Sequence, residues 1–328
     1  FGVQSIMLST EFISSASCPL CHKSTESILT MQLRRGSGIV HYCAECHHGF
    51  LVPDLGLDTK TYYAENYRQE YSHSAEAVGT NAREIFDVYR HYQLDRLRLI
   101  SPHLAKTTRL LEVGASSGQF LVNIKDQIAT AHAIELNKAC CAFMQEELGI
   151  HADSEFLRES VFKENLYDVV CSFQVMEHVP DPIVFLRELR QSTKKGGTIF
   201  VEVPNLHDPL LSVWEVNSYK KFFYHSAHLH YFTEDSLKKT AEIAGFLPEH
   251  VDIIFMQDYN LLNHLNWVMN DAPQATCHVG LSAINFVGNN LEITNWVNEK
   301  MTKLNSEYIE KLVGAKATSN LMMVLKNV

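Results

Sequence analysis

Four of the eight cysteines have the spacing of a metal site. They form two Cys-x-x-Cys pairs, Cys18–Cys21 and Cys43–Cys46, with 21 residues between the pairs. Two thiolates on one tight turn hold one side of a tetrahedral Zn²⁺, and a second such turn completes the site. Disulfides would need a secretory context, and a redox pair would need a thioredoxin-like unit; neither pattern surrounds these residues. The sequence therefore predicts a structural zinc bound by Cys18, Cys21, Cys43 and Cys46.

A turn of small residues has the character of a ligand-binding loop. Gly114-Ala115-Ser116-Ser117-Gly118 follows the apolar run Arg109–Val113. The two glycines let the backbone approach a ligand, and the N–H groups of a helix that follows would face a carboxylate or phosphate. Ser116 replaces the middle glycine of the dinucleotide fingerprint, which disfavours a nicotinamide cofactor. Glu135, at the end of the next apolar run, is placed to accept hydrogen bonds from both hydroxyls of a ribose.

Strands alternating with helices would position this turn. Short apolar runs at 109–113, 131–135, 167–173 and 198–203 predict strands. The predicted helices run from about 119, over 138–148, from Asp181-Pro182 to about 194–195, and over 236–244. Asp as N-cap, Pro in the first turn and Gly after the end are ordinary helix-boundary residues. This alternation indicates an α/β fold with a doubly wound, mostly parallel sheet of seven strands.

The end of the chain departs from this alternation. Residues 250–256 and 321–325 both read as strands, and between them lies a helical stripe that includes Trp296, Met301 and Leu312. We expect a helical insertion at about 258–316, before the last strand, that covers the site, contacts a second copy or only packs.

The predicted domains are a zinc-ribbon module at 1–60, a linker or helical lid at 61–100, and a ligand-binding domain at 101–328. Within the module, 39–42 reads as a strand, and 76–100 is helical by its apolar period. Four tyrosines, Tyr62, Tyr63, Tyr67 and Tyr71, belong either to a solvated linker or to a lid over the ligand.

Composition excludes several classes of protein. The chain has 328 residues, of which 46% are apolar and 20% charged, so it is neither disordered nor a coiled coil. No apolar run approaches the length of a membrane span, and no basic-then-apolar signal pattern occurs near the N-terminus, so we expect a cytoplasmic protein. The net charge of −10 argues against a nucleic-acid partner. A monomer or homodimer that acts on a small molecule fits these properties.

Four sequence motifs that follow one another along the chain resemble those of a known family. LLEVGASSGQFL, AIELN, YDVVCSFQVMEHVPDP and KKGGTIFVEVPN together resemble the class I S-adenosylmethionine (SAM) dependent methyltransferases, which have a Rossmann-like fold. With a four-cysteine module in front, the chain is similar to sugar and natural-product methyltransferases of deoxysugar biosynthesis. The resemblance implies a transferase that methylates a deoxysugar or another biosynthetic intermediate, with SAM and a structural Zn²⁺ as cofactors.

The resemblance also implies site residues. Gly114, Ser116 and Gly118 would hold the methionine part of SAM, Glu112 would orient that turn, Glu135 and Leu136 would bind the ribose, Asp153 or Ser154 would lie by the adenine, and Phe173 and Gln174 would border the sulfonium. His228 falls where that group of enzymes has a histidine, and we expect it to be the general base, with His225 as the second candidate. His225 and Ala227 stand where the group has Tyr and Glu, which weakens the match for C-methylation.

Other interpretations stay open from the sequence. Glu177-His178 either caps and packs beneath the cofactor or contacts a divalent metal or the substrate. An RNA methyltransferase with a zinc module is a second functional hypothesis, although residues 1–60 hold four basic against five acidic side chains. A binding protein that keeps the fold without catalysis is a third.

Overall fold

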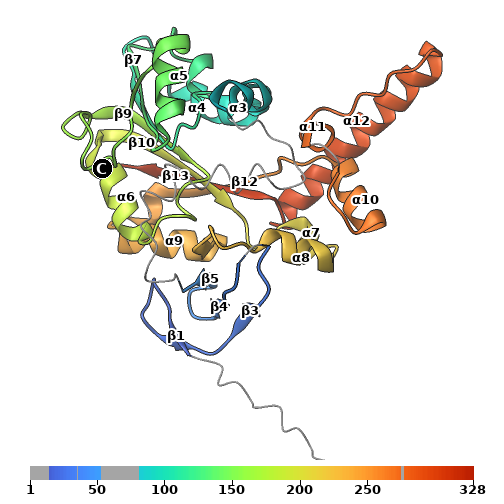
Figure 1. The fold of residues 1–328 in the computed structure, drawn as a ribbon, viewed down its shortest axis with the longest axis horizontal. Coiled ribbons are helices and arrows are strands. Elements are labelled where there is room, and N and C mark those ends of the chain that lie inside the picture. The colour runs from blue at the N-terminus through green and yellow to red at the C-terminus, as the bar shows by residue number, and fades with distance from the viewer. Residues whose placement is uncertain (1–14, 35, 53–80, 275–276) are drawn as a thin grey trace, which may run out of the picture.

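The central sheet is built from seven strands. The computed structural model describes residues 15–34, 36–52, 81–274 and 277–328. The strands lie in the order β12-β13-β10-β9-β6-β7-β8, and only β13 runs antiparallel to its neighbours. Helices α3 and α5 cover one face, and α6 and α9 cover the other (Figure 1). The predicted doubly wound α/β fold is confirmed.

The strands of this sheet are apolar because helices cover both of its faces. β9 reads YDVVCSF and β13 reads NLMMVLK, and most of their side chains are buried. Their bounds are β6 (Arg109–Val113), β7 (Thr130–Ile134), β8 (His151–Asp153), β9 (Tyr167–Phe173), β10 (Thr193–Pro204), β12 (Val251–Met256) and β13 (Asn320–Lys326).

Polar caps fix where the helices begin. The Asp181 carboxylate accepts hydrogen bonds from the backbone N–H groups of Ile183 and Val184, and the Asn137 side chain accepts one from Cys140. The bounds are α3 (Ala82–Tyr89), α4 (Leu94–Ile100), α5 (Lys138–Leu148), α6 (Pro182–Gln191), α7 (Pro209–Ser212), α8 (Asn217–Phe223) and α9 (Glu234–Ile243). Of the helix predicted over 76–100, residues 76–80 lie outside the described part, and the rest is split by a 3₁₀ turn at Arg90–Tyr92.

Two helix predictions were wrong in extent. After the glycine turn, the chain forms only a 3₁₀ turn, Leu121–Asn123, where we expected a helix from about 119. The Asn123 amide donates to the carbonyls of Gln119 and Phe120 and thereby competes with the helical pattern. Helix α6 ends at Gln191, earlier than the predicted 194–195, because Thr193 already pairs with Tyr167 of β9.

The predicted helical insertion lies between β12 and β13. It consists of α10 (Leu261–Asn270), α11 (Cys277–Leu281) and α12 (Leu291–Gly314). Helix α12 extends away from the sheet (Figure 1), and Leu312 is its one fully buried side chain. In the described parts of the chain, no helix combines the length and apolarity needed to cross a membrane.

The cysteine-bearing module has a small sheet of its own that reaches into the larger domain. The module also has a separate two-stranded sheet of β1 (Ala16–Ser17) and β2 (Ser24–Thr25), whereas β3 (Ile28–Thr30), β4 (Val40–Cys43) and β5 (His48–Leu51) belong to the larger one. The four-stranded sheet has the order β11-β5-β4-β3, and its edge strand β11 (His230–Tyr231) comes from far along the chain. The predicted domain bounds stay predictions, and residues 53–80, with the four lid tyrosines, lie outside the described residues.

Candidate functional site

A cavity of ≈ 1410 Å³ opens at the carboxyl ends of the parallel strands, where α/β folds bind ligands. It exceeds the roughly 300–1,000 Å³ of ordinary ligand pockets, which leaves room for two molecules. Nine residues predicted from the sequence line it: Glu112, Gly114, Ser116, Glu135, Leu136, Phe173, Gln174, His225 and His228.

In the turn after β6, the side chain of Val175 packs directly against the backbone of Gly114. Gly114 has φ +82°, and a Cβ there would lie 2.2 Å from Cγ2 of Val175. Only glycine satisfies both conditions. Ser116, with φ 50°, also adopts the left-handed conformation, which costs a non-glycine residue free energy and is found mainly at functional sites.

Glu135 ties this turn to the end of β7. One carboxylate oxygen accepts from the backbone N–H of Ser116 at 2.8 Å, and the other accepts from Asn137 at 2.9 Å. An ionised carboxylate has about four acceptor positions, so two remain for a ligand.

Three predicted residues, Gly118, Asp153 and Ser154, do not line the cavity. Gly118 lies against α5, where a Cβ would come within 2.9 Å of Cγ of Met144. The Asp153 carboxylate accepts from the backbone N–H of Val161. The cavity wall beyond β8 is made instead by Phe156, Leu157 and Arg158, while Ser154 does not line it.

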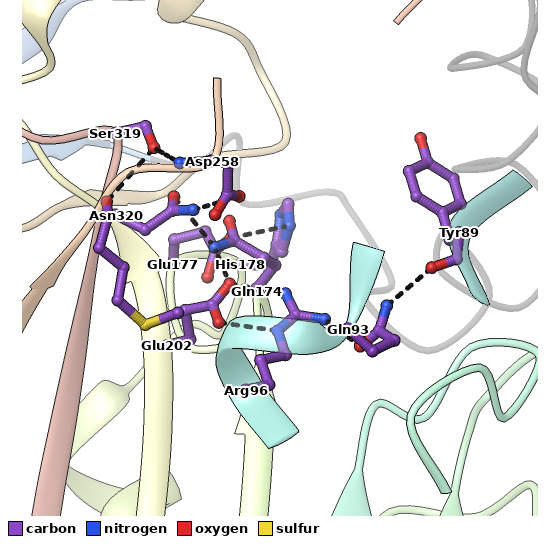
Figure 2. Close-up of polar contacts among 11 residues, drawn as sticks. Tyr89, Gln93, Arg96, Gln174, Glu177, His178, Glu202, Asp258, Ser319 and Asn320 are labelled. Atoms are coloured by element: carbon purple, nitrogen blue, oxygen red, sulfur yellow. Dashed lines mark hydrogen bonds and ion pairs between the residues drawn. The ribbon is translucent and has the colours of Figure 1, made fainter. Parts of the chain in front are cut away.

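Glu112 lies at the bottom of the site beside a buried ion pair. Arg96 of α4 donates two hydrogen bonds to the Glu202 carboxylate, at 2.7 and 2.6 Å (Figure 2). Burial raises the pKa of Glu112 to about 8, although Arg96 opposes this shift. Burial therefore favours the uncharged form of Glu112.

The same network continues through Gln174. This residue has φ 57°, and its side-chain amide donates to Glu202 at 2.9 Å and to Asn320 at 3.2 Å. Asn320 in turn donates to Asp258 at 2.6 Å (Figure 2). The network thus joins the ends of β9, β10, β12 and β13 below the cavity.

A second group of polar residues lines the cavity beside this network, where Glu177 and His178 lie close to Gln174 (Figure 2). Glu177 and His178 follow β9, and His225 and His228 precede β11. The Glu177 carboxylate lies 3.6 Å from Nε2 of His178 and 3.9 Å from Nε2 of His228. Burial raises the pKa of Glu177 to about 8.

The two predicted bases lie together. Their ring centroids are 3.7 Å apart. Burial, with the neighbouring imidazoles, lowers the pKa of His225 and of His228 well below the usual histidine value. Both rings are therefore neutral at pH 7. Nδ1 of His225 accepts a hydrogen bond from the backbone N–H of Ala227 at 3.3 Å.

Several lining residues had no sequence signal. Arg34 comes from the module, and its guanidinium lies 3.8 Å above the ring of Phe222. The insertion supplies further wall residues, namely Leu281, Ser282, Ala283, Asn305 and Ile309. A lone arginine and a mixed polar segment have no motif, and only the fold brings them to the cavity.

The four-cysteine cluster fits a structural zinc. One sulfur from each of Cys18, Cys21, Cys43 and Cys46 lies within 4.8 Å of the others, and none of the four is in a disulfide. The Sγ atoms of Cys21 and Cys43 are 3.6 Å apart, close to the roughly 3.8 Å that tetrahedral Zn–S bonds of about 2.3 Å imply.

Comparison with known families identifies the larger domain. The sequence model described as "Methyltransferase domain" matches residues 86–251, just over half of the chain. This range contains the glycine turn, Glu135, and the Glu177 and His228 segments.

The chain is also similar to individual methyltransferases. It is 33% identical over 79 residues to the ubiquinone biosynthesis O-methyltransferase of Pectobacterium atrosepticum, covering 24% of this chain and 29% of that protein. It is 30% identical over 120 residues to the arsenite methyltransferase of Rattus norvegicus, covering 31% and 32%. The chain thus spans about a third of the length of these curated relatives.

Solved structures are similar at low identity. A SAM-dependent methyltransferase from Archaeoglobus fulgidus aligns with a TM-score of 0.45 and 20% identity, over 72% of this chain and 94% of that one. The Haemonchus contortus phosphoethanolamine N-methyltransferase 2 in complex with SAM gives a TM-score of 0.46 and 12% identity, over 85% and 62%. With the family match over half of its length, the chain belongs to the methyltransferase domain family.

Proposed function

We propose that the protein transfers the methyl group of SAM to a small-molecule acceptor, a deoxysugar or another biosynthetic intermediate. One observation carries the proposal: the glycine turn, Glu135 and the His225–His228 pair open onto a single cavity of ≈ 1410 Å³. This volume accommodates SAM and an acceptor side by side.

The residues of the turn would hold SAM. Glu135 uses two acceptor positions on the N–H groups of Ser116 and Asn137, and its remaining positions face the ribose hydroxyls. Gly114 and Ser116 line the cavity next to Glu135 and would hold the methionine part, and Phe173 and Gln174 at the end of β9 would border the sulfonium. The family match over these residues supports the assignment.

Methyl transfer is an in-line displacement, for which the bound sulfonium supplies the leaving group. The chain must hold the acceptor atom near the methyl group, and such positioning contributes roughly 7–11 kcal/mol. An acceptor that loses a proton needs a base, which we assign to His228, with His225 as the second candidate, because both rings are neutral and line the cavity.

We also propose that the four-cysteine cluster binds a structural Zn²⁺. Tetrahedral thiolate spacing supports this role. The cytoplasmic location, the lack of a nucleic-acid or membrane partner, and the monomeric or homodimeric state stay predictions from the sequence.

Calorimetric titration with SAM tests the proposal. We expect micromolar binding by the full chain, and a loss of at least tenfold in Glu135→Ala, because two ribose hydrogen bonds to an ionised carboxylate disappear. Glu146→Ala, an exposed acid on α5, is the control and should bind like the unaltered chain. Failure of the unaltered chain to bind SAM would refute the function, and equal binding by Glu135→Ala would refute the ribose assignment.

A further inference from the structure

We infer that Glu177, His178 and His228 form a second metal site, which binds a divalent transition-metal cation at the cavity wall. The site is separate from the four-cysteine cluster. The inference rests on the proposed function only for the role of the ion, which is to hold an acceptor oxygen or nitrogen.

Two separate segments bring the three ligands together. Glu177 and His178 follow β9, and the backbone carbonyl of Glu177 accepts from the N–H groups of Leu229 and His230 at 2.8 and 3.0 Å. These bonds fix the loop that carries His228 against Glu177. One ligand atom from each of the three side chains lies within 4.8 Å of the others.

The distances suit an ion better than direct contact. Nε2 of His178 and Nε2 of His228 lie 3.6 and 3.9 Å from Oε1 of Glu177, which is too long for a hydrogen bond. Donor atoms about 2.0–2.2 Å from one tetrahedral ion lie roughly 3.3–3.5 Å apart. The observed separations exceed this by a few tenths of an ångström, which small side-chain rotations close.

Glu177 lacks the partners that a buried carboxylate requires. The residue is 1% exposed, and neither carboxylate oxygen has a hydrogen-bond partner among the described residues. Leaving such a group unsatisfied costs about 1–3 kcal/mol or more. A cation between Glu177 and the two imidazoles would satisfy it.

His178 already has the geometry of a metal ligand. Its Nδ1 donates to the backbone carbonyl of Ala227 at 2.8 Å, so the proton resides there and Nε2 keeps its lone pair toward Glu177. Metal-binding histidines almost always make such a second hydrogen bond, which fixes the tautomer and the ring orientation.

The donor set indicates the class of ion. Two imidazoles and one carboxylate suit Zn²⁺ and related transition metals, whereas Mg²⁺ and Ca²⁺ prefer oxygen ligands alone. All three side chains line the cavity, so the open coordination positions face the acceptor. His228 would then act as a ligand rather than as a base, and the ring of His225 lies beside it with the two centroids 3.7 Å apart.

Zinc content and zinc X-ray absorption on the full chain test the site. After equilibration with Zn²⁺ and removal of the excess, we expect two zinc ions per chain. The absorption spectrum should contain a sulfur shell near 2.3 Å and a nitrogen or oxygen shell near 2.0–2.1 Å. Glu177→Gln and His228→Gln should each retain one zinc ion, and their spectra should contain only the sulfur shell. That sulfur shell also shows that the cysteine module of each variant is folded.

His264→Gln is the control, since His264 is a buried histidine that lies outside the cluster, and it should keep two ions. One zinc in the unaltered chain, or two in both ligand variants, would overturn the inference. SAM titration of the same samples separates the outcomes: SAM binding with one zinc refutes only the metal site, and two zincs without SAM binding refutes only the methyltransferase function.

Discussion

At the scale of single residues, the glycine turn combines two demands that the sequence could only suggest. Gly114 needs both a positive φ and an absent side chain, because Val175 occupies the space of a Cβ. Gly149 at the end of α5 has a similar φ of +65°, but nothing lies within 4 Å of its would-be Cβ. A substitution at Gly149 therefore tests backbone strain alone, whereas one at Gly114 tests backbone strain together with a steric clash.

Gly114→Ala should destabilise the fold by more than Gly149→Ala does. We expect about 1 kcal/mol for the backbone strain alone at Gly149, and at least twice that at Gly114, where the methyl group also displaces Val175. Urea unfolding of both variants measures the difference, and SAM titration should show weaker binding in Gly114→Ala only. Equal losses in the free energy of unfolding would show that Val175 moves aside for the added methyl group at no energetic cost.

Site residues that belong to a sequence motif could be predicted. Residues that reach the site only through tertiary contacts between distant segments could not. Ser116 follows β6 and Glu135 follows β7, and the parallel pairing of these two consecutive strands brings them together. Asp153 points to the backbone of Val161 because the segment after β8 has no fixed pattern. Arg34 reaches the cavity through contacts between segments almost two hundred residues apart, as in its backbone hydrogen bond to Tyr224.

At the scale of elements, α4 is held to the sheet by one ion pair. Arg96 and Glu202 make a two-pronged contact, and Glu202 is 1% exposed (Figure 2). This contact anchors a helix whose residues Gln93–Arg96 form part of the cavity wall. It places the segment before β6 over the ends of the strands.

Arg96→Met should destabilise the protein by about 3–5 kcal/mol, because it leaves the Glu202 carboxylate buried without its counter-ion. Adding Glu202→Gln should recover part of this loss, since the remaining group is then uncharged. Urea unfolding of the two single variants and the double variant gives the coupling between the residues. Additive losses would show that the two side chains act independently.

Elements with local boundary signals could be predicted closely. Helix α5 runs over the predicted 138–148 because Asn137 caps its start and Gly149 ends it. The short turn at Leu121–Asn123 and the early end of α6 depend on competing contacts from Asn123 and from β9. The two-residue strand β11 pairs with β5 across about 180 residues, a register that no local pattern encodes.

At the scale of the whole molecule, the cysteine module shares one sheet with the strand that follows the loop of His225 and His228. His230 and Tyr231 pair with Phe50 and Gly49, and Thr233 donates to the carbonyl of His47, next to Cys46. The loop of His225 and His228 therefore lies between the module and Glu177. A zinc ion that fixes the cysteines would also fix this loop.

Cys46→Ser should loosen the shared sheet without unfolding the larger domain. We expect amide hydrogen exchange at Gly49–Leu51 and His230–Tyr231 to accelerate about tenfold or more, since the loss of one thiolate weakens zinc binding. Exchange at β7, in the middle of the domain sheet, is the internal control and should stay slow. Unchanged protection in β5 and β11 would show that the small sheet holds without the metal.

The shared sheet also restricts how this architecture can be recombined. A fragment cut after Leu51 would lose its fourth strand, and a methyltransferase domain begun at residue 81 would expose the bare edge of β11. Chimeras that exchange the amino-terminal segment between relatives must therefore carry residues 224–233 with it.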